Sequence, residues 1–371
     1  MKILIYLGHP AQYHFFKNII QELSAHGHTL KILIKSKDIL EKLVQEDRMI
    51  VENILPEGRG DSKASMISSM LKRDIRVFKI ARKFKPDMLL GSDTSVSHIG
   101  RLISKPCLTV GEDDYTIIKK LAWLLMPFST CILSPDSCDL GPFNYKKISY
   151  SGYMKLAYLH PGVFTPSSVG IENYTNTKYC IIRLAKLVAY HDSNVRGLCE
   201  EDILKIIDLL EARSFKIYID SEYPLSEKIK PFQLDIHKNR MHDLMSFASL
   251  VITDSQSMTV ESAMLGVPSI RFNDFVGKIG VLNELENVYK LTYGIKPSDP
   301  QSLFTKVDEL SGIENIKDLF QQRRLKMLSE KINVTRFFVW LIENYPRSIS
   351  IMKHNPGYQK KFIQNRSESS R

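Results

Sequence analysis

The sequence has few cysteines and no long apolar run. Its five cysteines form no Cys-x-x-Cys pair, which excludes a disulfide framework and leaves no zinc-ligand spacing. No stretch reaches the roughly 18 apolar residues of a membrane span. The most apolar segment, 121–133, is interrupted by Pro127 and Ser129. No signal-peptide pattern precedes the apolar run that begins at Ile3. We therefore expect a cytoplasmic protein with reduced thiols.

The composition is that of a globular protein with an excess of basic residues. Of 371 residues, 43% are hydrophobic and 25% are charged, which excludes a disordered chain and a collagen-like repeat. Lysine and arginine outnumber aspartate and glutamate by 51 to 41. This excess favours anionic partners such as nucleotides or phospholipid surfaces, although a basic surface kept for solubility gives the same balance. A non-catalytic nucleic-acid-binding protein is the alternative from another class. However, no motif of such proteins is present, so we expect no nucleic-acid partner.

Short apolar runs alternate with helical patterns along two stretches of the chain. Runs such as 2–7, 29–34 and 107–110 read as buried strands, and the pattern begins again at 179–184 after a linker-like segment, 152–168. Continuous apolar strands that alternate with helices predict parallel sheets covered on both faces. We predict two Rossmann-like α/β domains and a third, terminal segment. The ranges are an N-terminal domain over 1–156, a C-terminal domain over 157–345, and a basic, disordered tail over 346–371.

The most informative motif lies between two predicted strands of the second domain. It runs from Asp254 to Pro268, follows the strand 250–253 and opens a helix. Ser255, Ser257 and Thr259 place hydroxyls beside the free amides of a helix N-terminus, where a phosphate binds well. If Ser257 is the N-cap, Glu261 lies one turn into the helix, within reach of a ribose diol. The alternative is a well-capped helix that binds nothing and ends at Gly266.

This motif resembles the nucleotide-sugar motif of GT-B glycosyltransferases and non-hydrolysing UDP-N-acetylglucosamine 2-epimerases. Their pattern is Asp-Ser-Gly-Gly, then Glu, then Leu-Gly-x-Pro, and Gln256 and Ser257 stand here in place of the two glycines. The resemblance implies that Ser255 and the amides that follow it hold a diphosphate, while Glu261 holds the ribose. It also implies a GT-B arrangement with the active cleft between two domains, a UDP-linked donor as substrate, no separate cofactor and no bound metal.

The N-terminal segment from Gly8 to Asn18 resembles the opening of the family called domain of unknown function 354. That family is a GT-B relative often associated with surface-polysaccharide synthesis. His9 and His14 flank the turn after the first predicted strand, and either is a candidate general base for an acceptor hydroxyl. Asp93 is the other candidate base, although it would equally cap a helix that starts near Val96.

Three basic residues are candidates for binding the diphosphate. Arg183 ends a predicted strand, Lys186 follows it, and Lys278 lies between glycines. Each would stabilise the charge that grows on a leaving diphosphate, or would be an ordinary surface cation. The acidic turn 112–114 suggests a metal site, but it has no histidine partner at ligand spacing, so we interpret it as a solvated loop.

The segment 119–128 pairs two lysines with an aromatic and aliphatic run. This pattern is typical of helices that lie on a membrane surface, and also of a core helix between strands. Peripheral contact with an anionic membrane, at the inner face of the cell membrane, is therefore one prediction.

Together these features predict a glycosyltransferase that moves a sugar from a nucleotide-sugar to a surface-polysaccharide or lipid-linked acceptor. A nucleotide-sugar 2-epimerase is the alternative, although the N-terminal half shows no convincing set of paired acids and bases for it.

Overall fold

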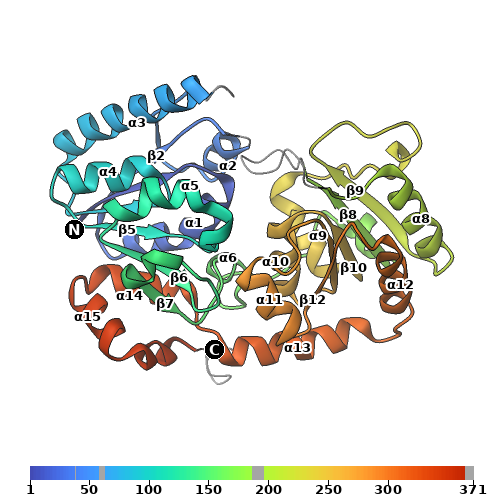
Figure 1. The fold of residues 1–371 in the computed structure, drawn as a ribbon. Helices are drawn as coiled ribbons and strands as arrows, with labels where there is room; N and C mark the ends of the chain where they lie inside the picture. Colours follow the sequence, from blue (N-terminus) through green and yellow to red (C-terminus); the bar gives the residue numbers. More distant parts are fainter. Residues whose placement is uncertain (38, 58–62, 186–195, 364–371) are drawn as a thin grey trace. The chain divides into compact units, whose positions relative to one another are not determined.

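The computed structural model describes residues 1–37, 39–57, 63–185 and 196–363 (Figure 1). The chain forms two compact units: Met1–Tyr158 together with Lys331–Arg371, and Leu159–Glu330. The predicted border after residue 156 lies close to this division. Residues 331–345, which were predicted in the second domain, belong instead to the first unit. No helix among the described residues is long and apolar enough to cross a membrane.

The first unit is built on a sheet of seven parallel strands in the order β3-β2-β1-β4-β5-β6-β7. The strands are β1 (Lys2–Leu7), β2 (Thr29–Ile34), β3 (Glu52–Asn53), β4 (Met88–Gly91), β5 (Cys107–Val110), β6 (Cys131–Pro135) and β7 (Lys147–Tyr150). Strands β4, β5 and β6 are buried along their whole length, as the predicted parallel sheet requires. The two edge strands, β3 and β7, were not predicted.

Two sets of helices belong to this sheet. The helical elements are α1 (Pro10–Ala25), α2 (Leu40–Glu46), α3 (Lys63–Phe84), α4 (Thr94–Leu102), α5 (Tyr115–Leu125), η1 (Met126–Phe128), η2 (Gly141–Lys146), α6 (Leu156–Leu159), α14 (Val334–Glu343), α15 (Arg347–His354) and η5 (Pro356–Phe362). Helix α3 packs on α4, which packs on α5, while α1 packs on α2 and α14 (Figure 1). One face of α14 is fully buried and supplies Phe337 and Phe338 to the core.

The C-terminal segment differs from its prediction. The helical pattern of the sequence over 316–345 predicts one helix, but the structure divides it, because Asn333 caps a new helix by accepting a hydrogen bond from the Arg336 amide (3.0 Å). The prediction of a disordered tail is wrong for residues 347–362, which form α15 and η5. Met352 is buried, and the Gln359 side chain accepts a hydrogen bond from the Ser151 amide (2.7 Å). These contacts join the segment to β7, which sequence periodicity alone does not show.

The second unit is built on a sheet of five parallel strands in the order β12-β11-β10-β8-β9. The strands are β8 (Tyr179–Leu184), β9 (Lys216–Ser221), β10 (Leu250–Thr253), β11 (Ser269–Phe272) and β12 (Thr292–Ile295). The helical elements are α7 (Glu172–Thr175), α8 (Glu200–Glu211), η3 (Lys230–Phe232), η4 (Lys238–Arg240), α9 (Met241–Phe247), α10 (Gln256–Leu265), α11 (Gly280–Asn287), α12 (Pro300–Ser311) and α13 (Ile316–Glu330). In this register Thr253 lies between Arg183 and Arg271, so the residues after these strands meet at one edge of the sheet.

Candidate functional site

The site is built around the turn that joins β10 to α10. Ser255 has an extended backbone and is the N-cap, since its hydroxyl accepts a hydrogen bond from the Met258 amide (3.4 Å). The assumption that Ser257 is the N-cap is therefore wrong. Ser257 lies in the exposed first turn, and Gln256 beside it is half-buried. The amides of this first turn have no carbonyl partner within the helix, which makes the turn suited to an anion.

Thr259 does not provide the ligand-facing hydroxyl that the sequence suggested. Its side chain is fully buried and donates a hydrogen bond to the Ser255 carbonyl (2.7 Å). At the other end, Gly266 closes α10 in the left-handed region (φ 70°), as the alternative of a well-capped helix requires. The structure thus confirms that α10 is capped at both ends, and a capped helix can still present the amides of its first turn to a ligand.

Asp254 connects three strand ends at this edge of the sheet. Its side chain accepts a hydrogen bond from the Ala185 amide after β8 (2.7 Å), and its carbonyl accepts one from the Asn273 side chain after β11 (2.8 Å). Burial raises the pKa of Asp254 from 3.8 to about 6, although the Ala185 hydrogen bond and the charge of Arg183 act in the opposite direction. Asp254 opens the motif in the sequence, but no role was predicted for it.

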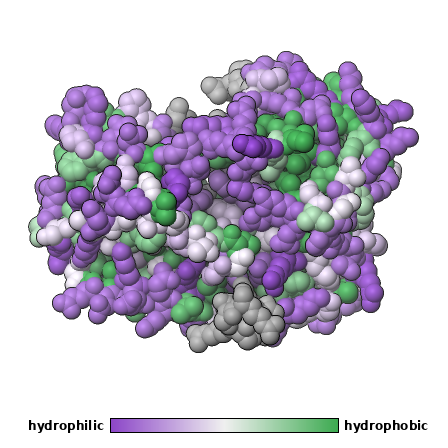
Figure 2. Space-filling model, turned by 180° about the vertical axis from the view of Figure 1, so that it is seen from behind, coloured by the Kyte–Doolittle hydropathy of each residue, from purple (hydrophilic) through white to green (hydrophobic). Residues whose placement is uncertain are grey.

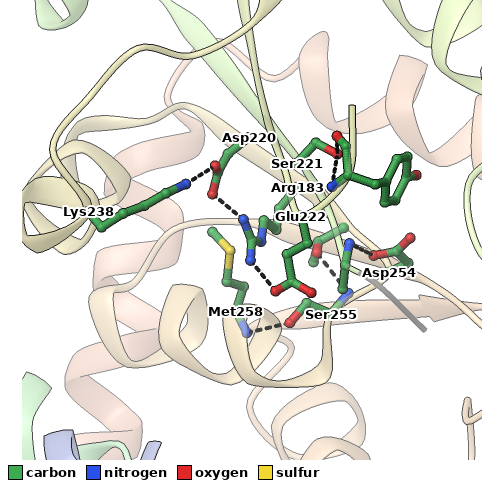
Figure 3. Close-up of polar contacts among 11 residues, drawn as sticks. Arg183, Asp220, Ser221, Glu222, Lys238, Asp254, Ser255 and Met258 are labelled. Carbon is green, nitrogen blue, oxygen red and sulfur yellow. Dashed lines mark hydrogen bonds and ion pairs between the residues drawn. The ribbon is translucent and has the colours of Figure 1, made fainter. Parts of the chain in front are cut away.

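Arg183 is already engaged by carboxylates. Its guanidinium pairs with Asp220 at the end of β9 and with Glu222 just beyond it, and Lys238 also pairs with Asp220 (Figure 3). The Arg183 guanidinium, which was predicted to neutralise a diphosphate, is therefore already paired with two carboxylates. Neither acid was predicted, because β9 is far from Arg183 in sequence.

The other residues predicted for the donor site are Glu261, Lys278 and Lys186. Glu261 is partly buried on α10, and His242 on α9 approaches its carboxylate at 3.5 Å. Lys278 follows Gly277, which has a positive φ of 84°, and its ammonium lies 6.0 Å from the centre of the Phe275 ring. Lys186 lies outside the described residues.

The first unit places His9 and His14 at the start of α1. His9 is the N-cap, and its Nδ1 accepts a hydrogen bond from the Ala11 amide (3.2 Å). His14 lies in the second turn, half-buried between the rings of Tyr13 and Tyr158, whose centres are 5.2 and 5.3 Å away. The His9 side chain therefore already caps α1, whereas the His14 side chain packs against two aromatic rings.

Asp93 caps α4, as the alternative interpretation proposed, and it also forms a buried ion pair. It accepts a hydrogen bond from the Ser95 amide (3.0 Å) and pairs with Arg73 of α3. Burial raises the pKa of Asp93, but the charges of Arg73 and Lys35 outweigh that effect and hold the pKa below its ordinary value. A carboxylate stabilised in this way is a weak base.

The prediction of a solvated loop after β5 is wrong for Glu112 and Asp114, whereas Asp113 is exposed. Glu112 pairs with the buried ammonium of Lys155 and also accepts a hydrogen bond from the Met154 amide (3.2 Å). Asp114 is buried and accepts a hydrogen bond from the Asp139 amide (2.7 Å). The ion pair of Glu112 with Lys155 was not predicted, because the two residues come from distant segments. Among the described residues, no group of three or more histidine, cysteine, aspartate or glutamate side chains is arranged to hold a metal ion.

No family model and no curated protein matches the chain, so the resemblance to domain of unknown function 354 is not confirmed. Solved structures do match over almost the whole chain. A putative UDP-N-acetylglucosamine 2-epimerase from Listeria monocytogenes is 11% identical, with a TM-score of 0.64 over 89% of this chain and 95% of that one. UDP-GlcNAc 2-epimerase from Neisseria meningitidis bound to UDP-GlcNAc is 15% identical, with a TM-score of 0.61 over 88% and 100%.

A glycosyltransferase of kitacinnamycin is 13% identical, with a TM-score of 0.59 over 94% of this chain and 98% of that one. At these identities the likeness shows the fold alone. The predicted fold class is confirmed in that the chain has two Rossmann-like α/β domains, a fold that it shares with these structures.

Proposed function

We propose that the chain is a glycosyltransferase that moves a sugar from a UDP-linked nucleotide-sugar to a glycan or lipid-linked acceptor. The observation that carries this proposal is the position of the α10 N-terminus. It follows β10, the middle strand of the second sheet, and Ser255 caps it there. In open α/β sheets, ligands bind at the carboxyl ends of the strands, and helix N-termini favour phosphate groups. The similar Neisseria structure carries UDP-GlcNAc, which supports a nucleotide-sugar as the ligand class.

In this proposal the first turn of α10 holds the diphosphate. Ser255 and the amides of Gln256 and Ser257 bind its oxygens, and the Glu261 carboxylate binds the ribose diol. Arg183 and Lys278 stabilise the negative charge that develops as the glycosidic bond breaks. Because Arg183 is paired with Glu222 beforehand, the donor must compete with that partly exposed carboxylate for the guanidinium.

We assign the general base to His14. An imidazole has an ordinary pKa near 6.5 and can take a proton from an acceptor hydroxyl near neutral pH. Asp93 is less suitable, because its ion pair with Arg73 stabilises the charged form that would have to accept the proton. His9 is the N-cap of α1, and its Nδ1 is used by the Ala11 amide.

A nucleotide-sugar 2-epimerase is the second candidate, since two of the three similar structures described above carry that name. The two activities differ in what happens to the donor alone. An epimerase removes and returns a proton on the sugar ring without an acceptor, whereas a transferase needs the acceptor to turn over.

The test is to incubate UDP-sugars with the protein in heavy water, with and without a glycan or lipid-linked acceptor. We expect no deuterium on the sugar carbons, and release of UDP only when acceptor is present. Deuterium incorporation from donor alone would contradict transfer and support epimerisation.

A further inference from the structure

The outer surface of α3 carries an apolar stripe that nothing in the described structure covers. Ile67, Leu71 and Ile75 recur every four residues and are 58%, 54% and 56% exposed. The opposite side of the helix is buried and includes Val77 and Ala81. The stripe is therefore additional to the face that packs on the sheet, and core packing does not account for it.

The same helical layer exposes further large apolar side chains on α4, α5 and η1. Trp123 is 57% exposed and Phe128 42%, so the interpretation of the segment 119–128 as a core helix is wrong for its outer face. Figure 2 draws the molecule from behind the view of Figure 1. Hydrophilic side chains predominate on that face, and hydrophobic ones form separate patches on it. Of the sixteen large hydrophobic side chains exposed in the described part of the chain, eight belong to these four elements. They are Ile67, Leu71, Ile75, Leu102, Leu121, Trp123, Leu124 and Phe128.

The layer is also strongly basic. Among the side chains that the structure describes, α3, α4, α5 and η1 carry nine lysines and arginines but one acid, Asp74, which is paired with His98 of α4 (2.9 Å). Arg73 is buried against Asp93, and Lys72 and Arg76 approach Glu57 at 3.9 and 3.0 Å. The other six cations are exposed. Exposed cations flank the apolar side chains on each helix, such as Lys79 on α3, Arg101 on α4 and Lys119 on α5. Apolar groups surrounded by cations match the boundary between the headgroups and the acyl chains of an anionic bilayer.

We propose that the outer layer formed by α3, α4, α5 and η1 docks on an anionic lipid bilayer. The apolar side chains would enter the headgroup region, and the surrounding lysines and arginines would bind lipid phosphates. A second copy of the chain fits this surface poorly, because self-association through it would bring cations against cations. The inference extends the sequence pattern of 119–128 to three helices, and it does not depend on which reaction the chain catalyses.

The first experiment uses Trp123 as a depth probe. Trp340 is the other tryptophan of the sequence, so a Trp340→Phe variant leaves Trp123 as the sole emitter. Vesicles that contain phosphatidylglycerol and brominated acyl chains should quench Trp123 and shift its emission to the blue. Absence of both effects, with protein that sediments no more with these vesicles than with phosphatidylcholine, would overturn the proposal.

The second experiment compares surface variants by vesicle sedimentation. Removing the two charges in Lys119→Gln/Lys120→Gln should weaken binding about 30-fold, since each lysine near an anionic surface contributes ~1 kcal/mol. Leu71→Gln/Ile75→Gln should also weaken binding, by about tenfold or more. A matched control on α13, Leu325→Gln/Lys326→Gln, removes an exposed apolar side chain and an exposed cation outside the layer.

Circular dichroism and thermal unfolding establish that each variant is folded. Binding that is unchanged in both surface variants, or reduced as much in the α13 control, would contradict the proposal. A homodimer in solution that dissociates on Leu71→Gln/Ile75→Gln would assign the surface to a second copy of the chain and overturn the bilayer.

Discussion

Replacing Asp254 by asparagine should change how stability depends on pH. Asp254 is 2% exposed, and burial raises its pKa from 3.8 to about 6 in the folded protein. Below the unfolded pKa both states bind the proton, so the group has no effect on stability. As pH rises from there to the folded pKa, the unfolded state loses the proton first. The carboxyl group therefore lowers the free energy of unfolding progressively over this range.

The two pKa values give the size of the effect. The full penalty above the folded pKa is about 3 kcal/mol, and roughly half of it is already present near pH 5. Asparagine keeps the hydrogen bond from the Ala185 amide but cannot ionise. Relative to wild type, Asp254→Asn should therefore gain about 1 kcal/mol in unfolding free energy between about pH 5 and about pH 7.5.

Urea unfolding of wild type and variant at the two pH values measures this double difference. Asp208→Asn is the control, because Asp208 is an exposed aspartate on α8 of the same unit. A difference between wild type and Asp254→Asn that is the same at both pH values would refute the reasoning.

Three further predictions concern other parts of the molecule. His14→Ala should reduce acceptor-dependent UDP release about 10²–10⁴-fold and leave donor affinity unchanged, as steady-state kinetics and calorimetry would show; equal loss of donor affinity would count against a base. Arg73→Met should cost about 3 kcal/mol in urea unfolding, because it removes the ion-pair partner of the buried Asp93 carboxylate while the charge of Lys35 remains. A cost below about 1 kcal/mol, the level of a surface pair, would show that the ion pair is solvated. Gly266→Ala should lower stability by at least ~1 kcal/mol, since φ is 70° and an added Cβ would lie 2.6 Å from the Gln321 side chain; an unchanged thermal midpoint would contradict that strain.

The alternation of apolar strands and helices could be read from the sequence because buried parallel strands are continuous apolar runs. Strand β10 (Leu250–Thr253) and the helix that follows it were predicted for this reason. The cap of that helix was placed two residues late, since Ser255 and Ser257 both carry a hydroxyl. Only the backbone conformation decides between them.

Contacts between distant segments could not be predicted. The pairs of Arg183 with Asp220 and of Glu112 with Lys155 depend on the order of strands in each sheet, which periodicity does not encode. The apolar face of α14 indicates burial but not the sheet that buries it, so the segment was assigned to the second domain. The exposed stripe on α3 was missed for a related reason: an apolar residue in a helical pattern is read as core unless its environment is known.

The binding of a nucleotide-sugar at the start of α10 is tested most directly by calorimetric titration of a panel of UDP-sugars. Wild type should bind at least one of them. Glu261→Ala should weaken that binding roughly 10- to 100-fold, because hydrogen bonds to a charged group contribute about 1.5–3 kcal/mol. The control Glu211→Ala, which removes an exposed glutamate at the end of α8, should bind like wild type. Wild-type protein that binds none of the UDP-sugars, or Glu261→Ala protein that binds the best one unchanged, would contradict the proposed donor site.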